Sequence, residues 1–176
     1  SDVCSSDLIE FKNFVGLKPN LQKITRKQKM NYRRLYIQNT KIFITVVTAK
    51  RRDILITNIN ILRQAFKDAK QKFKFDIDSV VILPNHFHMI ILPENITEYP
   101  EIIRKIKSYF SRVIDIETIE NYEISESKKD KNEKDIWQRR YWEHTIQNEE
   151  ELNKCRDYIH YNPVKHKYVK KAKDWA

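Results

Sequence analysis

Residues 75–92 read FDIDSVVILPNHFHMIIL, and this stretch decides the fold. Two segments that contain Val and Ile, residues 75–83 and 86–92, flank a Pro84-Asn85 pair that is typical of a turn. The pattern predicts a hairpin of two antiparallel strands, with Pro93 ending the second. A hairpin in the middle of the chain indicates that the sheet is antiparallel.

Before the hairpin, the sequence predicts one strand and one helix. Residues 36–48 are dominated by Ile, Val, Phe and Thr, which favours a buried strand. Apolar residues then recur at three- and four-residue spacing up to about residue 72, as in an amphipathic helix. Asp53 is suited to cap the start of that helix.

After the hairpin, residues 97–113 are predicted to form a second amphipathic helix, with its basic side chains off the apolar face. Residues 117–135 are almost wholly polar or charged and predict an exposed loop. A fourth strand is expected over residues 136–146. A last helix, capped by Asn148, is expected from residue 149 to about 161, where Asn162-Pro163 would stop it.

The resulting order is strand, helix, strand, strand, helix, strand, helix. This order favours an α+β fold with an antiparallel sheet and flanking helices over a doubly wound parallel sheet. A chain of 176 residues is expected to form a single domain, here over residues 30–176. Residues 1–20 differ in composition from the rest and are expected to be non-native or disordered.

Charge points to nucleic acid as the partner. The chain has 34 Lys and Arg against 24 Asp and Glu, a formal net charge of +10, which attracts polyanions through phosphate contacts. A Lys-rich composition can equally reflect an AT-rich genome and solvated helix faces, so charge alone leaves both readings open.

Cysteine usage and hydropathy indicate in which cellular compartment the protein is expected. Cys4 and Cys155 support neither a disulfide framework nor a cysteine-rich zinc site, which favours a reducing cytoplasm. No apolar run approaches the roughly 20 residues needed to span a bilayer. We therefore expect no membrane segment. A homodimer remains open.

The first candidate site is the His86-Phe87-His88 stretch. Side chains alternate along a strand, so His86 and His88 project to one side while Phe87 turns toward the core. Two converging imidazoles suit a divalent cation if a further donor completes the site. The alternative is a pair of strand histidines on a solvated face, and the spacing alone does not decide between them.

The second candidate site is on the last predicted helix, where Tyr158 and Asn162 are four residues apart and share one face. If that face meets the histidines, Asn162 could complete the metal shell and Tyr158 would lie beside a metal-bound phosphate. Tyrosine is a weak nucleophile near neutral pH and would benefit from such a cation. The alternative is that Tyr158 packs against the sheet and Asn162 only caps the helix.

Together, five motifs resemble the REP-associated tyrosine transposases, a branch of the single-tyrosine transposases in the HUH endonuclease superfamily. The matching stretches are YRRLYI at residues 32–37, FITVVT at 43–48, VILPNHFH at 81–88, IWQRRYWEHTI at 136–146 and DYIHYNPVKH at 157–166. Their order along the chain is more specific than any single motif.

The resemblance implies a ferredoxin-like, HUH-type sheet of four or five antiparallel strands. It implies that His86, His88 and Asn162 bind Mg²⁺ or Mn²⁺, and that Tyr158 is the nucleophile. Attack on a phosphodiester would leave a 3′-hydroxyl and a 5′-phosphotyrosine link, which a second 3′-hydroxyl can resolve to join strands. The implied substrate is single-stranded DNA that forms hairpins.

Other tyrosine and histidine residues are weaker candidates for a role in the site. Tyr109 has a basic surround, but its neighbours at four-residue spacing are not metal ligands, so Tyr158 is preferred as the nucleophile. His144 is expected to be a hydrogen-bonded structural residue rather than a ligand. His160 and His166 carry little signal.

DNA contacts are expected from basic residues next to aromatic ones, since charge attracts the phosphates and rings stack on unpaired bases. The candidates are Arg33, Arg34, Tyr36, Arg139, Arg140 and Trp142. Unspecific attraction for the DNA backbone is expected from Lys165, Lys167, Lys170, Lys171 and Lys173.

Two other functions compete with a DNA nickase. One is a hairpin-binding module derived from a transposase that no longer does chemistry, against which the retained His, Tyr and Asn residues argue. The other is a zinc hydrolase, which would need a further strong ligand such as a His-Glu-x-x-His helix. The chain offers no such pattern.

Overall fold

The computed structural model describes residue 13 and residues 36–120, 122–124 and 134–175. The strands are β1 (Ile42–Val47), β2 (Phe75–Ile82), β3 (His86–Pro93) and β4 (Trp142–Thr145), and the helices are α2 (Ile59–Lys72), α3 (Tyr99–Val113) and α5 (Glu149–Lys165). This is the order expected from the sequence. The α+β class is thereby confirmed.

The four strands form one antiparallel sheet in the order β2-β3-β1-β4. The predicted hairpin is the β2–β3 pair, and β1 lies beside β3 with Thr45 opposite His88. The pairing of β2 with β3 slips between Ile77 and Ser79, so Asp78 is an extra residue in β2.

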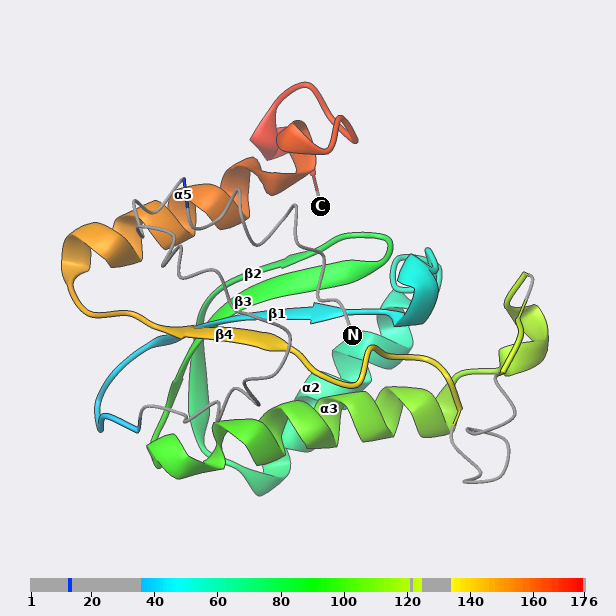
Figure 1. The fold of residues 1–176 in the computed structure, drawn as a ribbon, viewed down its shortest axis with the longest axis horizontal. Coiled ribbons are helices and arrows are strands. Elements are labelled where there is room, and N and C mark those ends of the chain that lie inside the picture. The colour runs from blue at the N-terminus through cyan, green and yellow to red at the C-terminus, as the bar shows by residue number, and fades with distance from the viewer. Residues whose placement is uncertain (1–12, 14–35, 121, 125–133, 176) are drawn as a thin grey trace, which may run out of the picture.

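Helices cover both faces of the sheet, with α2 and α3 on one face and α5 on the other (Figure 1). Alternation along the strands explains the two layers, because Ile42, Ile44 and Val46 pack against α2 and α3 while Phe43 packs against α5. The α5 side of the sheet therefore has its own, smaller apolar core. Among all the residues that the structure describes, no helix is long and apolar enough to cross a membrane.

Two elements in the first half begin later than predicted. Strand β1 starts at Ile42 rather than at residue 36, because a turn precedes it in which Asn39 has a φ of 57°. Helix α2 starts at Ile59 with Asn58 at its N-cap position. Asp53, the predicted cap, instead accepts a hydrogen bond from the Asn85 side chain at 2.7 Å.

Two elements in the second half also differ from the prediction. Strand β4 covers only residues 142–145, and Trp137 forms just an isolated bridge with Thr48. Helix α5 continues through Asn162-Pro163 to Lys165, and both residues of that pair are buried. The turn after Pro163 is held by backbone hydrogen bonds from residues 166, 167 and 168, so the proline does not end the helix.

The predicted exposed loop at residues 117–135 is anchored at both ends. Ile119 packs into the core on the α2 and α3 side, and Asp135 is only 5% exposed. Residues 121 and 125–133 lie outside the described residues, as do residues 1–12 and 14–35. The predictions for residues 1–20, Arg33 and Arg34 fall in those ranges.

Candidate active site

The two histidines of β3 lie on the face of the sheet that α5 covers. Each side chain is 1% exposed, and the centroids of the two rings are 4.9 Å apart. Phe87, between them in sequence, packs into the core on the opposite face. The predicted shared orientation of His86 and His88 is confirmed.

Each imidazole is fixed through its Nδ1 atom. The Thr45 hydroxyl on β1 forms a 2.8 Å hydrogen bond with Nδ1 of His88, and the Asn85 amide oxygen lies 2.7 Å from Nδ1 of His86. Asn85 is itself oriented by its bond to Asp53. Such outer partners fix the ring orientation and leave Nε2 as the ligand atom of each imidazole.

Burial keeps His88 uncharged. Burial lowers the pKa of His88 well below its ordinary value, and electrostatic interactions with His86, Lys165, His166 and Arg51 lower that pKa further. A neutral imidazole is the form that binds a metal ion. The Nε2 atom of His88 is buried and has no hydrogen-bond partner within the described part of the chain.

Helix α5 and its C-cap residue present three polar residues to the histidines at four-residue spacing. The Tyr158 ring lies 5.3 Å from the His88 ring, and the His166 ring lies 5.3 Å from the His86 ring, measured between centroids. Asn162 lies between them on the same helix face and is fully buried. The helix face that carries Tyr158 therefore meets the two histidines.

Within the described ranges, the Asn162 side chain is buried without the hydrogen bonds that an amide ordinarily requires. Neither Oδ1 nor Nδ2 has a partner among the residues that the structure describes. Burying an unsatisfied amide costs free energy, so a group that persists in this state often has a ligand. Asn162 and Nε2 of His88 are groups of this kind on the facing surfaces.

Lys165 reaches back along α5 to the tyrosine. Its Nζ donates a hydrogen bond to the Tyr158 hydroxyl at 3.4 Å and lies 5.0 Å from the centre of the Tyr158 ring. The two residues are seven apart, so they lie two helical turns from each other on one side of α5. An ammonium group is thus next to the oxygen that would carry out an attack.

Tyr109 and His144 are separated from this centre by their contacts. Tyr109 belongs to α3, packs against the core on the other face and has Arg112 over its ring at 5.4 Å. Nε2 of His144 lies 2.8 Å from Glu151 Oε1, and the Trp142 ring stacks on His144. The structural role predicted for His144 agrees with these contacts.

The predicted DNA-contact residues are not all gathered at one place. Trp142 lies near the site, because its ring is 5.8 Å from Phe43, which itself contacts Tyr158. Arg139 and Arg140 are exposed just before β4. Tyr36 instead contacts Tyr99 at the start of α3, against the opposite face of the sheet.

Lys165 and His166 also lie at this centre, although the sequence did not predict them as site residues. Their spacing of seven and eight residues from Tyr158 would have placed them on the same helix face, but only if α5 continued past Pro163. The Asn162-Pro163 pair was expected to end the helix. That wrong boundary hid both residues.

The fold and this centre define a class: an α+β protein with a buried histidine pair facing a helix tyrosine. The family model described as "Transposase IS200 like" matches residues 36–162 of the chain. The chain belongs to the IS200-like transposase family.

Individual relatives agree with this assignment. The chain is 37% identical over 147 residues to a protein of Haemophilus influenzae named for the REP-associated tyrosine transposases, and the match covers 82% of each chain. It is 36% identical over 146 residues to the REP-associated tyrosine transposase of Escherichia coli, covering 82% of this chain and 78% of the relative. The resemblance stated from the motifs is confirmed.

One solved structure matches the fold at the same level of identity. It is a REP-associated tyrosine transposase bound to a REP hairpin, with a TM-score of 0.66 and 36% identity. The match covers 82% of this chain and 78% of that one. The four-stranded antiparallel sheet with flanking helices is therefore an architecture shared with that transposase.

Proposed function

We propose that this protein is a transposase-type endonuclease that nicks single-stranded, hairpin-forming DNA through Tyr158 and rejoins the strands. The observation that carries the proposal is the 5.3 Å approach of the Tyr158 ring to the His88 ring on one side of the sheet. Hairpin DNA is supported as the ligand by the solved relative, which is bound to a REP hairpin.

In the proposed reaction the Tyr158 hydroxyl oxygen attacks the phosphorus of a phosphodiester. The new bond joins that oxygen to phosphorus, and the bond from phosphorus to the 3′-oxygen breaks. The electron pair stays on the 3′-oxygen, which takes up a proton, while the phenolic proton passes to solvent. The products are a free 3′-hydroxyl and a 5′-phosphotyrosine link, and attack by another 3′-hydroxyl reverses the step.

We propose Mg²⁺ or Mn²⁺ as the cofactor, bound by His86, His88 and Asn162. The donor set fits a divalent cation, because the buried Nε2 of His88 and the buried Asn162 amide oxygen have no other partner among the described residues. A bound cation would polarise the scissile phosphate and offset the charge that develops on it. In the described ranges no group of three or more His, Cys, Asp or Glu side chains could hold a metal. The proposed site therefore needs the Asn162 amide oxygen as its third protein ligand.

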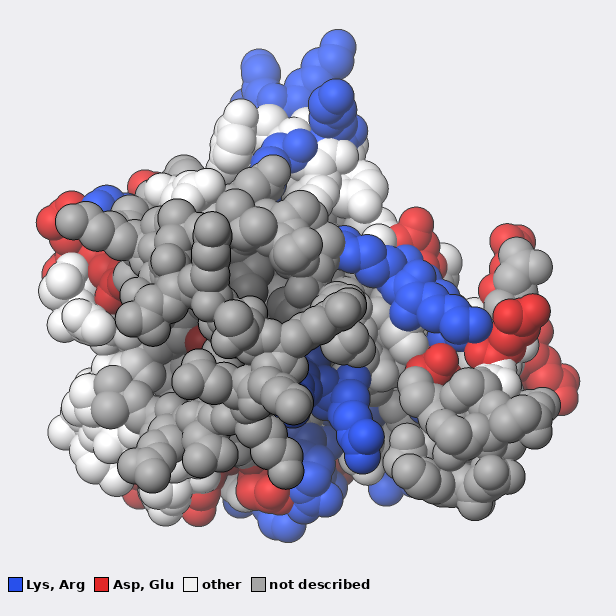
Figure 2. All heavy atoms as spheres, in the orientation of Figure 1, with Lys and Arg blue, Asp and Glu red and all other residues white. Residues whose placement is uncertain are grey.

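The DNA backbone would be held by exposed cations around this centre. Figure 2 shows Lys and Arg side chains gathered over the C-terminal segment that follows α5, where Lys167, Lys170, Lys171 and Lys173 are exposed. A second candidate is the start of β4, where the exposed Arg139 and Arg140 closely precede Trp142 in the sequence. Basic and aromatic side chains together can hold a phosphate and stack on an unpaired base. Roles for Arg33, Arg34 and Tyr36 in DNA binding stay predictions, as does a cytoplasmic location.

The proposal is tested by trapping the covalent intermediate. The protein is incubated with labelled single-stranded hairpin DNA and Mn²⁺, denatured, and examined for a labelled protein band. We expect an adduct in the wild type and in Tyr109→Phe and none in Tyr158→Phe. Loss of the adduct only in Tyr109→Phe would overturn the assignment, and hairpin binding without any adduct would identify a silent binding module.

A further inference from the structure

Lys165 contacts the atom that would form and break the covalent link to DNA. Its Nζ lies 3.4 Å from the Tyr158 hydroxyl oxygen, and the side chain is only partly exposed. We propose that Lys165 is a further catalytic residue, whose ammonium group stabilises the negative charge that returns to the Tyr158 oxygen when strands are rejoined. This inference rests on the proposed function.

The position of Lys165 is fixed by more than one contact. Its ammonium lies over the Tyr158 ring, 5.0 Å from the centroid, where the ring face attracts a cation. It is also the last residue of α5, the helix end at which a positive charge is favourable. The charge is therefore held beside Tyr158 before DNA arrives, so little reorganisation is needed during the reaction.

The electrostatic field of the Lys165 ammonium also reaches the histidine that faces Tyr158. The Lys165 Nζ atom lies 5.0 Å from the centre of the Tyr158 ring, and that ring lies 5.3 Å from the His88 ring. Both the tyrosine and the histidine that faces it thus lie within the field of one ammonium group. A cation placed at a developing oxyanion in a partly dehydrated site is worth more than the same cation in water.

The joining step shows where this stabilisation acts. A 3′-hydroxyl oxygen attacks the phosphorus of the phosphotyrosine, forms the new phosphodiester bond and gives its proton to solvent. The bond between phosphorus and the Tyr158 oxygen breaks, and its electron pair remains on that oxygen. A phenolate forms 3.4 Å from the Lys165 ammonium and is then protonated from solvent. No external oxidant, reductant or energy source is consumed.

Lysine and arginine both supply a cationic donor, whereas glutamine is polar and only one bond shorter than lysine but carries no charge. The variants for the test are therefore Lys165→Gln and Lys165→Arg, with Lys154→Gln as the matched control. Lys154 is also on α5, and its Nζ is paired with exposed Glu150 at 2.8 Å, so its replacement changes the net charge equally. Circular dichroism and thermal unfolding verify that each variant is folded.

Rates are measured with a labelled hairpin oligonucleotide at saturating concentration in Mn²⁺. The readouts are adduct formation, resolution of the isolated adduct by an added 3′-hydroxyl strand, and the Kd for the hairpin. We expect Lys165→Gln to slow resolution by about 100-fold, with the Kd changed by less than about threefold. Lys165→Arg should recover most of the rate, and Lys154→Gln should match the wild type.

Resolution at the wild-type rate in Lys165→Gln would overturn the role of Lys165 and leave the proposed function standing. So would a loss of hairpin affinity that accounts for the whole effect, since Lys165 would then act only in binding. A wild-type protein that forms no adduct at all would instead overturn the proposed function, and the role of Lys165 with it.

Discussion

Asp78 and Arg156 form a bidentate ion pair that joins α5 to strand β2 of the sheet. Arg156 donates from Nε to Oδ1 of Asp78 at 2.8 Å and from Nη2 to Oδ2 at 2.7 Å. Asp78 is the extra residue in β2, and Arg156 precedes Tyr158 by two positions on α5. The contact therefore sets where the tyrosine helix lies on the sheet.

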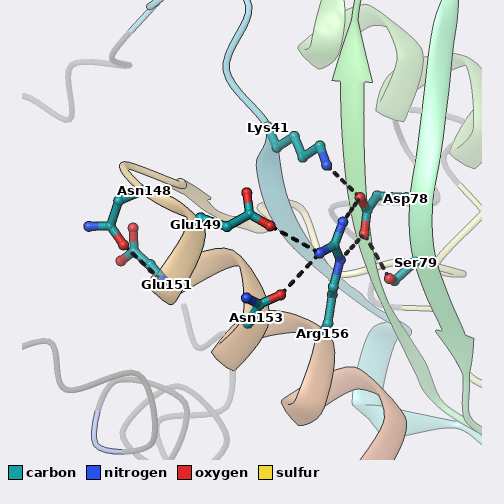
Figure 3. Close-up of polar contacts among 8 residues, drawn as sticks. All are labelled: Lys41, Asp78, Ser79, Asn148, Glu149, Glu151, Asn153 and Arg156. Carbon is teal, nitrogen blue, oxygen red and sulfur yellow. Dashed lines mark hydrogen bonds and ion pairs between the residues drawn. The ribbon is translucent and has the colours of Figure 1, made fainter.

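A polar network surrounds this pair (Figure 3). Lys41 Nζ lies 2.6 Å from Asp78 Oδ2, and the Ser79 hydroxyl donates to Oδ1 at 3.0 Å. On the helix side, Asn153 and Glu149 accept from Nη1 of Arg156. Chiefly because of the Arg156 hydrogen bonds, the pKa of Asp78 is far below its ordinary value. The carboxylate is thus charged and fully partnered.

Removing the charge of Asp78 should destabilise the protein. Asp78→Asn keeps the shape but leaves Arg156 and Lys41 without their carboxylate, so we expect a loss on the order of 3 kcal/mol in the free energy of unfolding. Urea denaturation measures it. The control is Glu101→Gln, which removes the carboxylate of an exposed pair with Arg104 and should cost much less, because exposed ion pairs contribute little to stability. Equal losses in the two variants would contradict the prediction.

The same carboxylate predicts a pH dependence. Because the folded pKa of Asp78 is lowered, its stabilising contribution is present above the unfolded pKa of about 3.9 and is lost as the pH falls below it. The stability difference between wild type and Asp78→Asn should stay constant from pH 7 to pH 5 and shrink toward pH 3. Urea titrations at each pH measure this difference. A difference that grows on acidification would refute the assignment.

The sequence predicted those features of the fold that depend on local pattern. Alternation along a strand is a property of neighbouring residues, and it placed His86 and His88 on one face without knowledge of the rest. Element boundaries depended on packing instead. Asn58 rather than Asp53 is at the N-cap position of α2, and Pro163 lies inside α5, because tertiary contacts outweighed the local signals.

The candidate site was predictable only in part for a related reason. Tyr158 and His88 are separated by 70 positions, so no spacing shows that they meet, and the expectation came from the resemblance. The Asp78–Arg156 pair, 78 residues apart, has no signal in the sequence at all. Lys165 would have been found had the helix been continued by one turn.

Phosphate contacts by Arg139 and Arg140 should appear in the salt dependence of binding. Both side chains are exposed and precede Trp142 closely in the sequence, so each can neutralise a phosphate. The double variant Arg139→Ala, Arg140→Ala should bind hairpin DNA more weakly, and the slope of log K against log salt should fall by about 1 per lost contact. Fluorescence anisotropy at several salt concentrations measures this slope, and Lys154→Ala serves as the control. An unchanged slope would exclude both arginines from the interface.

Replacing Asn162 should show that the metal-free protein is less stable because this residue is kept for binding a ligand. Its amide is fully buried, and neither polar atom has a partner within the described residues, so Asn162→Leu should raise the free energy of unfolding in EDTA by about 1 kcal/mol. Mn²⁺ should raise the Tm of the wild type by binding the native state and should have a much smaller effect on the variant.

The matched control for this pair of measurements is Asn153→Leu. Asn153 lies on the same helix but is exposed, and its side chain accepts a hydrogen bond from Arg156. Its replacement therefore removes a favourable contact instead of an unsatisfied amide, so this variant should gain no stability in EDTA and should keep the full response to Mn²⁺. Thermal unfolding of the three proteins with and without the metal separates the two effects. A destabilised Asn162→Leu that still responds to Mn²⁺ would mean that the amide serves the fold and not the cation.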